Sequence, residues 1–175
     1  MPEQHGFFYH FVDVRTGARV WNCEVSSIDT GLLLCGVLTC RQHFRDAEIR
    51  RLGQEIYERV DWTWLLTTNR TLGHGWKPET GMLKNDWDAY CELMLLYLLA
   101  LGSPTHPIPA DSWQVWRRPW VEYEGLRFMG MPSNAPAPLF VHQYSHAWFD
   151  FRGRRDAWTN YFENSVAATE AHRRF

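Results

Sequence analysis

The stretch Trp87-Asp-Ala-Tyr-Cys-Glu-Leu-Met-Leu-Leu-Tyr-Leu-Leu-Ala-Leu-Gly102 contains the longest apolar run of the chain and decides its fold. Apolar side chains on every side of a helix predict a helix that is buried nearly all round. We therefore expect a helix over residues 87–102, capped by Asp86, at the centre of a mainly α fold. Its apolar core is too short to span a bilayer, so the sequence predicts no membrane segment.

Glu92 interrupts this apolar run. A carboxylate removed from water must be paired, hydrogen-bonded or protonated, because burial disfavours its charged form. A buried carboxyl group that holds its proton is suited to act as a general acid. The alternative is a structural role, in which Glu92 lies on a narrow polar stripe and bonds a neighbouring helix.

The composition limits the classes of function. The chain has 175 residues, which predicts one domain, and a net charge of −2, which leaves no basic footprint for nucleic acid. Ten Trp residues are the main compositional signal, since Trp stacks on sugar rings and also fills cores. The four Cys form no C-x-x-C pair, so neither a zinc ribbon nor a disulfide framework is expected.

The N-terminus lacks the basic region and apolar core of a signal peptide, so the default location is cytoplasmic. A periplasmic location would follow if the N-terminus were truncated.

Outward from the apolar run, the pattern predicts helices joined by decorated loops. A small N-terminal β-hairpin precedes a pair of helices, and a loop that could hold a second hairpin follows. The expected elements are strands 6–12 and 19–24, helices from 26 or 27 to 44 and from 46 to 60, a loop over 68–81, a short helix over 111–117, an irregular excursion over 119–138, and helices 139–149 and 156–174.

Asp29 follows Glu24-Val-Ser-Ser-Ile at the start of the first long helix. A carboxylate there is favoured by the free amides and the helix dipole, so capping is one interpretation. The other is a second carboxylate that faces Glu92 across a cleft. Cleavage of a sugar bond needs two carboxylates, one to protonate the leaving oxygen and one to attack or to activate water.

The loop Gly73-His-Gly-Trp-Lys-Pro-Glu-Thr-Gly81 is a candidate substrate-binding segment. Trp76 could form a platform for a sugar ring, while His74 and Lys77 could bond its hydroxyl groups. The alternative is an ordinary cluster of turns, with Trp76 packed onto the core.

The segment His142-Gln-Tyr-Ser-His146 puts two imidazoles on one face of a predicted helix, and Asp150 continues that spacing. A zinc site is one interpretation. However, Gln143 stands where metalloproteases of this spacing carry glutamate, and the sequence offers no distant ligand. Hydrogen bonding to substrate or to neighbouring helices is favoured, and we expect neither a metal nor another cofactor.

Several of these segments together resemble the bacterial glucoamylase-like (glycoamylase) domain family. The resemblance covers almost the whole chain. It is carried by Gly6-Phe-Phe-Tyr-His-Phe11, Glu24-Val-Ser-Ser-Ile-Asp-Thr30, Gly75-Trp-Lys-Pro-Glu79, Ser103-Pro-Thr-His-Pro107, His142-Gln-Tyr-Ser-His146 and Tyr161-Phe-Glu-Asn-Ser165. The family includes endo-β-1,2-glucanases and the transglycosylation domain of cyclic β-1,2-glucan synthases, so the resemblance implies an α/α toroid that acts on a glucan.

The resemblance also implies roles for individual residues. Glu92 matches the acidic position before the apolar run and is expected to be the general acid. Asp29 matches an acidic substrate-subsite position. The other residues expected to line the cleft are Glu24, His74, Trp76, Lys77, Glu79, His106, His142, Gln143 and His146.

A complete toroid of six helical hairpins needs about twelve helices, whereas this sequence accounts for roughly six. Residues 1–175 are therefore expected to be a single, partial domain, about half of an (α/α)6 barrel. The expected function is hydrolysis or transglycosylation of a glucan by carboxylate acid/base chemistry, with β-1,2-glucan favoured and α-glucan the other candidate. The alternative is a non-catalytic fragment that binds carbohydrate, or that needs the remainder of the domain as a partner.

Overall fold

The computed structural model describes residues 3–131 and 136–175. The chain forms two compact units. The N-terminal unit comprises Met1–Trp87 and Leu96–Val115, and the C-terminal unit comprises Asp88–Leu95 and Trp116–Phe175. Helices account for most of the regular structure. Among the described residues, no helix is both long and apolar enough to cross a membrane.

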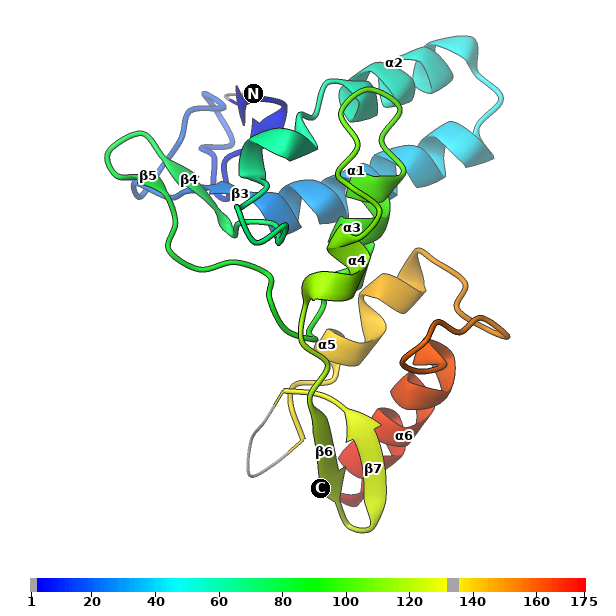
Figure 1. Ribbon diagram of the computed structural model, residues 1–175. Helices are drawn as coiled ribbons and strands as arrows, with labels where there is room; N and C mark the ends of the chain where they lie inside the picture. The colour runs from blue at the N-terminus through cyan, green and yellow to red at the C-terminus, as the bar shows by residue number, and fades with distance from the viewer. Residues whose placement is uncertain (1–2, 132–135) are drawn as a thin grey trace. The chain divides into compact units, whose positions relative to one another are not determined.

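The N-terminal unit is built on a pair of antiparallel helices, α1 (Ser27–His43) and α2 (Ala47–Glu58), which lie side by side in Figure 1. Ser26 caps α1 by accepting a hydrogen bond from the backbone N–H of Asp29. Asp46 caps α2 in the same way, because its carboxylate accepts from the first free amides of that helix. Both helices therefore begin where the sequence predicts.

Short antiparallel strands flank the start of α1. β3 (Val25–Ser26) pairs with β4 (Gly75–Lys77), which pairs with β5 (Gly81–Met82) to complete the hairpin expected in the 68–81 loop. Gly75 is required at the crossing, because a Cβ there would lie 2.0 Å from the carbonyl oxygen of Val25. This close approach fixes the β4–β5 loop beside the start of α1.

The N-terminal β-hairpin is shorter than expected. β1 (Glu3–Gln4) pairs with β2 (Phe7–Phe8). The two arms predicted as strands 6–12 and 19–24 form no regular strand pair, but an isolated bridge from Val12 to Arg19 and scattered hydrogen bonds join them. Between these arms the chain turns as predicted, since the carbonyl oxygen of Asp13 accepts from the N–H of Gly17. The N-terminal unit also contains a 3-10 helix, η1 (Trp62–Leu65), and α4 (Ser112–Val115).

The central apolar helix, α3 (Met94–Leu101), is as buried as predicted but begins seven residues later than the expected start at Trp87. Residues 88–90 are held in an extended conformation by Arg117, whose N–H donates to Asp88 and whose carbonyl accepts from Tyr90. The predicted cap was also wrong, because Asp86 accepts a hydrogen bond from Thr71. Tertiary pairing overrides local helix propensity here.

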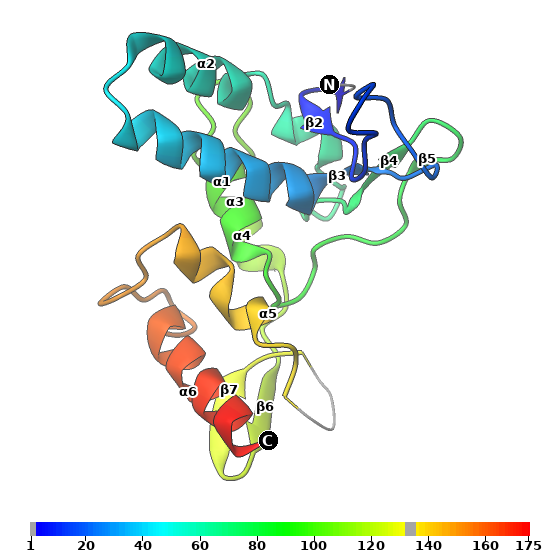
Figure 2. The same cartoon turned by 180° about the vertical axis from the view of Figure 1, so that it is seen from behind.

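The C-terminal unit pairs a β-hairpin with a long helix. β6 (Trp120–Tyr123) and β7 (Leu126–Met129) are joined by Glu124 and Gly125, both with positive φ, as a tight hairpin turn requires. α6 (Tyr161–Arg174) packs on β7, as Figure 2 shows from behind. The prediction of an irregular segment over 119–138 was therefore wrong for residues 120–129, while residues 132–135 lie outside the described chain.

The two predicted helices of this unit are also shorter than expected. The segment 139–149 is broken into α5 (Phe140–Gln143) and a 3-10 turn, η2 (Ser145–Ala147). The final helix begins at Tyr161 rather than Asp156, because the Asn160 side chain accepts from the free amides of Phe162 and Glu163 and caps it there.

Candidate functional site

Three ionisable side chains meet at the start of α1. His10 Nδ1 lies 2.9 Å from Glu24 Oε1, and His10 Nε2 lies 3.4 Å from Asp29 Oδ2. All three side chains are partly exposed, with exposed fractions between 25% and 40%. We call these residues the carboxylate cluster. Its imidazole bridges two carboxylates that remain accessible from solvent.

Local structure positions the carboxylates. The Ser26 hydroxyl, which caps α1, also donates to Asp29 Oδ2 at 2.6 Å, so the Asp29 side chain is fixed in the first helical turn. The backbone N–H of His10 donates to the carbonyl oxygen of Glu24 at 2.9 Å. This hydrogen bond holds the segment after β2 against the segment that leads into β3. The helix dipole favours negative charge at this end of α1.

The electrostatics of Glu24 favour its ionised form. Burial raises the pKa of this carboxyl, but a backbone hydrogen bond, the hydrogen bond with His10 and the charges of His10 and Lys77 more than offset burial, so its pKa is lowered. Glu24 is therefore suited to accept hydrogen bonds or to stabilise positive charge rather than to donate a proton.

The predicted substrate-binding loop lies beside this cluster, because β4 pairs with β3. Lys77 is near enough to Glu24 to influence its charge. Trp76 packs against Trp64, with ring centroids 5.8 Å apart, and is half-buried. The loop thus brings one cation and one indole to the carboxylates.

Three other predicted residues of the N-terminal unit have defined surroundings. Glu79 forms a two-pronged ion pair with Arg19, at 2.5 and 2.9 Å. His74 stacks on Trp87 with ring centroids 4.0 Å apart. His106 is exposed after α3, and its backbone N–H donates to Ser103.

Glu92 lies in the C-terminal unit, in a half-buried turn just before α3 rather than inside a helix. Ser145 holds that turn: its hydroxyl donates to the carbonyl oxygen of Glu92 at 3.1 Å and accepts from the N–H of Leu95 at 2.9 Å. The prediction that apolar helix neighbours surround Glu92 was therefore wrong. Glu92 is a half-buried residue whose backbone is held by hydrogen bonds to Ser145.

The imidazole of His142 belongs to a buried polar network in the same unit. Tyr90 Oη lies 3.1 Å from His142 Nδ1 and accepts a hydrogen bond from the Asn164 amide at 3.2 Å. Either Tyr90 or His142 can donate in this pair, according to which ring nitrogen of the imidazole carries the proton. We call Tyr90, His142 and Asn164 the buried network; His142 is only 1% exposed.

Burial lowers the pKa of His142 to about 4, and the nearby charges of His172 and His146 act in the same direction. Burial also lowers the pKa of His146, which packs against Phe151 and is half-buried. The Nε2 atoms of both rings lie buried without a hydrogen-bond partner in the described residues. Gln143, between them in sequence, is exposed.

The zinc interpretation of His142, His146 and Asp150 finds no support in the geometry. Asp150 forms an ion pair with Arg152 at 2.8 Å. In the part of the chain that the structure describes, no group of three or more His, Cys, Asp or Glu side chains is arranged to hold a metal ion.

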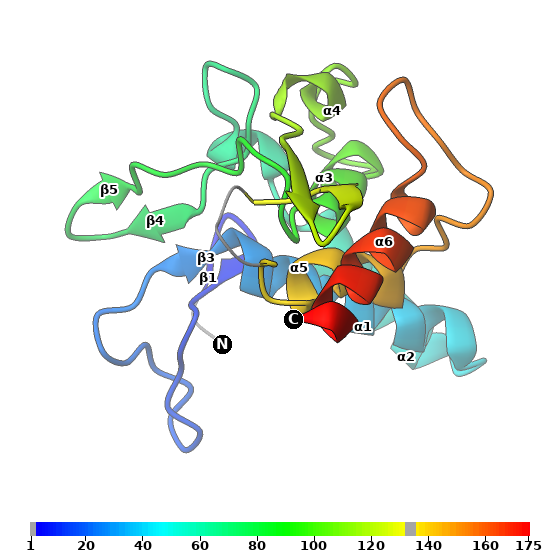
Figure 3. The ribbon, with the colours of Figure 1, turned by 90° about the horizontal axis from the view of Figure 1, so that it is seen from below.

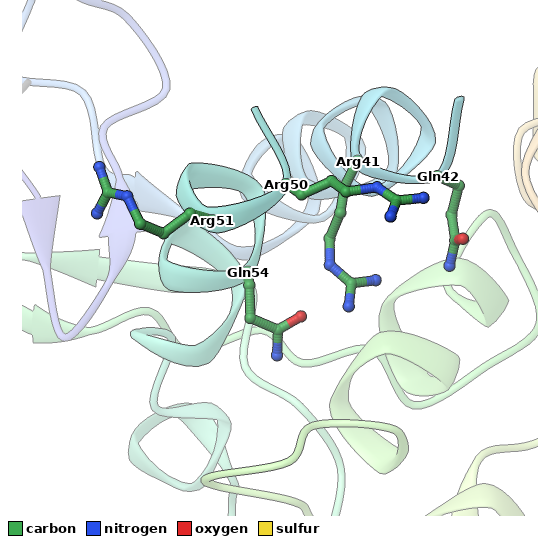
Figure 4. A pocket seen from close by; sticks show the side chains of 5 residues that line it. All are labelled: Arg41, Gln42, Arg50, Arg51 and Gln54. Carbon is green, nitrogen blue, oxygen red and sulfur yellow. The ribbon is translucent and has the colours of Figure 1, made fainter. Parts of the chain in front are cut away.

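A polar hollow of about 410 Å³ lies on the α1–α2 pair, away from the carboxylate cluster. It is lined by Arg41, Gln42, Arg50, Arg51 and Gln54. Figure 4 shows Arg51 pointing away from the others, and its guanidinium is paired with Glu48 and Glu55. The hollow is lined by cations and amides alone, so it lacks the carboxylates that acid/base chemistry on a sugar needs.

His10 is the residue that sequence reasoning missed. It lies in the Gly6-Phe-Phe-Tyr-His-Phe11 segment that contributes to the family resemblance, but no role was predicted for it, because its carboxylate partner Glu24 is 14 residues away. Only the folded structure shows which carboxylates it contacts.

Comparison with known proteins places this geometry in a family. A protein-family model described as "Putative glucoamylase" (Glycoamylase) matches residues 84–175, just over half of the chain. A curated protein of Parabacteroides distasonis, described as an exo beta-1,2-glucooligosaccharide sophorohydrolase, is 27% identical over 98% of this chain.

Solved structures share the fold. A crystal structure described as a putative glucoamylase from Bacteroides uniformis superposes with a TM-score of 0.89 at 22% identity over 99% of this chain. An endo-beta-1,2-glucanase from Chitinophaga pinensis, in complex with sophorotriose and glucose, gives a TM-score of 0.84 at 22% identity.

These relatives are longer than this chain, which spans 29% of the curated sophorohydrolase and 46% of each of those two solved structures. The family model matches residues 84–175, and this segment contains Glu92, the apolar helix α3 and the buried network. The chain belongs to the glycoamylase family.

Proposed function

We propose that this chain is part of a glycoside hydrolase or transglycosylase domain that acts on a glucan, with a β-1,2-linked glucan as the favoured substrate. The observation that carries the proposal is the carboxylate cluster, in which two accessible carboxylates share one imidazole. Membership of the glycoamylase family supports the reaction class. The β-1,2 linkage is named for the curated relative and for one of the solved structures.

In the proposed reaction, Glu92 acts as the general acid and donates a proton to the glycosidic oxygen as the bond to the anomeric carbon breaks. Water, or a sugar hydroxyl in transglycosylation, then bonds to that carbon and gives up its proton to the Glu92 carboxylate, which restores the acid. In the N-terminal unit, Asp29 and the ionised Glu24 are proposed to bind or orient the glucan through its hydroxyl groups. No cofactor takes part in these steps.

The other proposed sugar contacts divide by accessibility. Trp76 and Lys77 lie beside the carboxylate cluster and are the leading candidates, together with the exposed His106 and Gln143. We propose supporting roles for the remaining residues: His74 and Glu79 would hold the loop through Trp87 and Arg19, and His142 and His146 would shape the buried wall near Glu92.

We also propose that both compact units belong to one domain, an incomplete α/α toroid whose remaining helices act as a partner. An apolar groove of about 500 Å³ on the α1–α2 pair supports this, because aliphatic side chains do not usually stay open to water. Leu33, Ile49 and Leu52 are between 37% and 42% exposed there. The groove is lined by Leu32, Leu33, Gly36, Val37, Cys40, Ile49, Leu52, Gly53 and Ile56.

The exposed groove can be tested with a hydrophobic dye such as ANS. Leu52→Gln should lower the fluorescence of the bound dye, while Met82→Gln, at an equally exposed position outside the groove, should not. Equal dye binding by all three proteins would contradict an open apolar groove, and with it the proposed helical partner.

The function itself is tested by measuring sugar release from β-1,2-glucan and sugar binding separately, for the chain and for Glu92→Gln. We expect turnover by the unsubstituted chain, loss of turnover in Glu92→Gln, and binding that survives the substitution. Binding without product release by the unsubstituted chain would instead favour the second candidate function, a non-catalytic carbohydrate-binding fragment. Activity on α-1,4-glucan alone would overturn the proposed linkage.

A further inference from the structure

Two aromatic side chains stand exposed on the loop between β2 and β3. Trp21 is 81% exposed and Phe11 is 42% exposed, and their ring centroids lie 5.1 Å apart at an interplanar angle of 62°. Figure 3 shows this loop extending away from α1 and α2. An indole that is open to water over most of its surface has ring faces free for a ligand.

The backbone that presents Trp21 forms a tight turn, closed by a hydrogen bond from the N–H of Cys23 to the carbonyl oxygen of Val20 at 3.2 Å. Trp21 has a φ of 55° and Asn22 a φ of 47°, in the left-handed region that bulky side chains rarely adopt. Such conformations persist only where the surrounding structure enforces them, and they concentrate at functional sites.

Cys23 and Arg19 supply that enforcement. The buried Cys23 thiol makes two contacts of 3.3 Å with the backbone of Phe11, accepting from its N–H and donating to its carbonyl. Arg19 Nε donates to the carbonyl oxygen of Cys23 at 2.6 Å. The exposure of Trp21 is therefore a property of a braced loop.

The exposed rings lead directly to the carboxylate cluster. Phe11 stacks on the imidazole of His10, with centroids 4.0 Å apart and planes inclined by 17°. His10 contacts Glu24 and Asp29, as described above. A continuous row of aromatic rings therefore ends at two carboxylates. We call this row, Trp21, Phe11 and His10, the aromatic ledge.

This combination matches the surface chemistry of a pyranose. One face of a sugar ring is a layer of C–H groups that packs on an aromatic face, while its hydroxyl groups seek charged acceptors at the rim. The apolar groove on α1–α2 has the opposite character, since aliphatic residues line it without a carboxylate. The ledge therefore suits a hydroxylated ligand and the groove suits another helix.

We infer that Trp21 is a stacking platform for one glucosyl unit of the glucan, and that the aromatic ledge of Trp21, Phe11 and His10 forms a binding subsite beside Glu24 and Asp29. This inference rests on the proposed function, because it assumes that a glucan occupies the carboxylate cluster. Trp21 acts as a binding residue only and takes part in no bond-making step.

The test is calorimetric titration of the chain with sophorotriose, with maltotriose as a linkage control. Trp21→Ala should weaken sophorotriose binding by roughly tenfold, the loss expected when one well-placed aromatic contact is removed. Trp21→Phe should retain part of the affinity, because it keeps an aromatic face. Since Trp21 is exposed, both variants should melt at the temperature of the unsubstituted chain.

Phe44→Ala is the matched control. Phe44 is an exposed aromatic, 46% accessible, at the opposite end of α1 from Asp29. Phe44 follows Asp29 by 15 residues along α1, a separation of about 22 Å, so removal of the Phe44 ring should leave binding unchanged.

The possible results separate the subsite from the proposed function. Unchanged affinity in Trp21→Ala, or an equal loss in Phe44→Ala, would overturn the subsite and leave the function standing. Weakened binding in Trp21→Ala without any turnover by the unsubstituted chain would support the subsite while rejecting hydrolysis. Absence of sophorotriose binding by the unsubstituted chain would overturn both.

Discussion

The carboxylate cluster and the buried network each join a histidine to other polar side chains, yet they suit opposite tasks. His10 lies 35% exposed between two ionisable carboxylates, whereas His142 is 1% exposed and bonds the neutral Tyr90, which in turn bonds Asn164. The first arrangement can exchange protons and bind a polar ligand. The second is closed to solvent, so its hydrogen bonds stabilise structure.

Solvent access explains the difference, because burial penalises the charged form of an imidazole. The pKa of His142 is lowered to about 4 chiefly by burial, so the ring is neutral at physiological pH. Beside His10, by contrast, the hydrogen bonds and positive charges around Glu24 outweigh the effect of burial and lower the pKa of that carboxyl. Residue type alone would have assigned both histidines the same role.

Asp29→Asn tests the functional role of the carboxylate cluster, and we expect it to have the largest effect of the substitutions considered. The substitution keeps the shape of the side chain but removes the charge beside His10 and Ser26. We expect hydrolysis of β-1,2-glucan to fall by roughly 10²-fold or more, the usual scale for a lost charged group at a reacting centre. The measurement is the rate of reducing-sugar release.

Asp46→Asn is the control for that experiment. Asp46 caps α2 at the other end of the helical pair, and Asn caps a helix about as well as Asp, so rate and stability should both be retained. Full activity in Asp29→Asn would reduce the carboxylate cluster to a helix-capping arrangement.

Asn164→Ala tests the structural role of the buried network. The Asn164 amide accepts from the N–H of Met129 at 2.6 Å and donates to the carbonyl of Met129 and to Tyr90, while the side chain is 5% exposed. Removing it leaves buried polar groups unpaired, which should cost about 2–3 kcal/mol of unfolding free energy. Faster hydrogen exchange of the Met129 amide would report the loss.

Asn69→Ala, in an exposed turn, supplies the reference for ordinary surface substitution. If Asn164→Ala lost no more stability than Asn69→Ala, the buried network would contribute nothing to the C-terminal unit.

The pH dependence of stability sharpens the comparison further. Because the pKa of His142 is lowered from 6.5 to about 4 on folding, the unfolded chain binds more protons between these values. Stability is therefore full above pH 6.5 and falls as the pH drops toward 4, by roughly 2 kcal/mol between pH 7 and pH 5. Urea denaturation at a series of pH values measures this slope.

His142→Gln removes the titrating group and should flatten this part of the pH profile. His10→Gln should leave the same part of the profile in place, because the contribution predicted here comes from the buried ring. A slope that survives His142→Gln unchanged would assign the pH dependence to other groups.

Glu79→Gln should have the smallest effect. The ion pair between Glu79 and Arg19 is two-pronged, but the Glu79 side chain is 50% exposed and therefore screened by water. We expect a small loss of stability in urea denaturation, and a smaller loss still in high salt. A loss as large as that of Asn164→Ala would show that this pair holds the β4–β5 loop more strongly than its exposure implies.

Much of the local structure could be predicted because its determinants are close in sequence. Ser26 and Asp46 cap α1 and α2 at the expected positions, and the glycine-rich segment 73–81 forms the expected hairpin. The start of α3 could not be predicted, because residues 88–90 pair with Arg117, which is distant in sequence. The β6–β7 hairpin was missed because the prolines around it favoured an irregular segment.

The candidate site, too, could be predicted only in part from the sequence. Sequence motifs singled out Asp29, Glu24 and Lys77, and the pairing of β3 with β4 brings them together. His10 received no role, since its partner Glu24 is 14 residues away and no spacing links the two. His142 was predicted to contact substrate, and the structure shows its ring within a polar network of the interior.

By itself, the sequence determined the family, the apolar character of α3 and the helix starts that capping side chains set, because each depends on residue type or on neighbours within one or two turns. Only the tertiary structure decided which histidine is open and which is enclosed, where α3 begins, and that the rings of Trp21 and Phe11 lead to the carboxylates. Those properties depend on burial and on contacts between distant segments, and burial sets the energy of every charge it encloses.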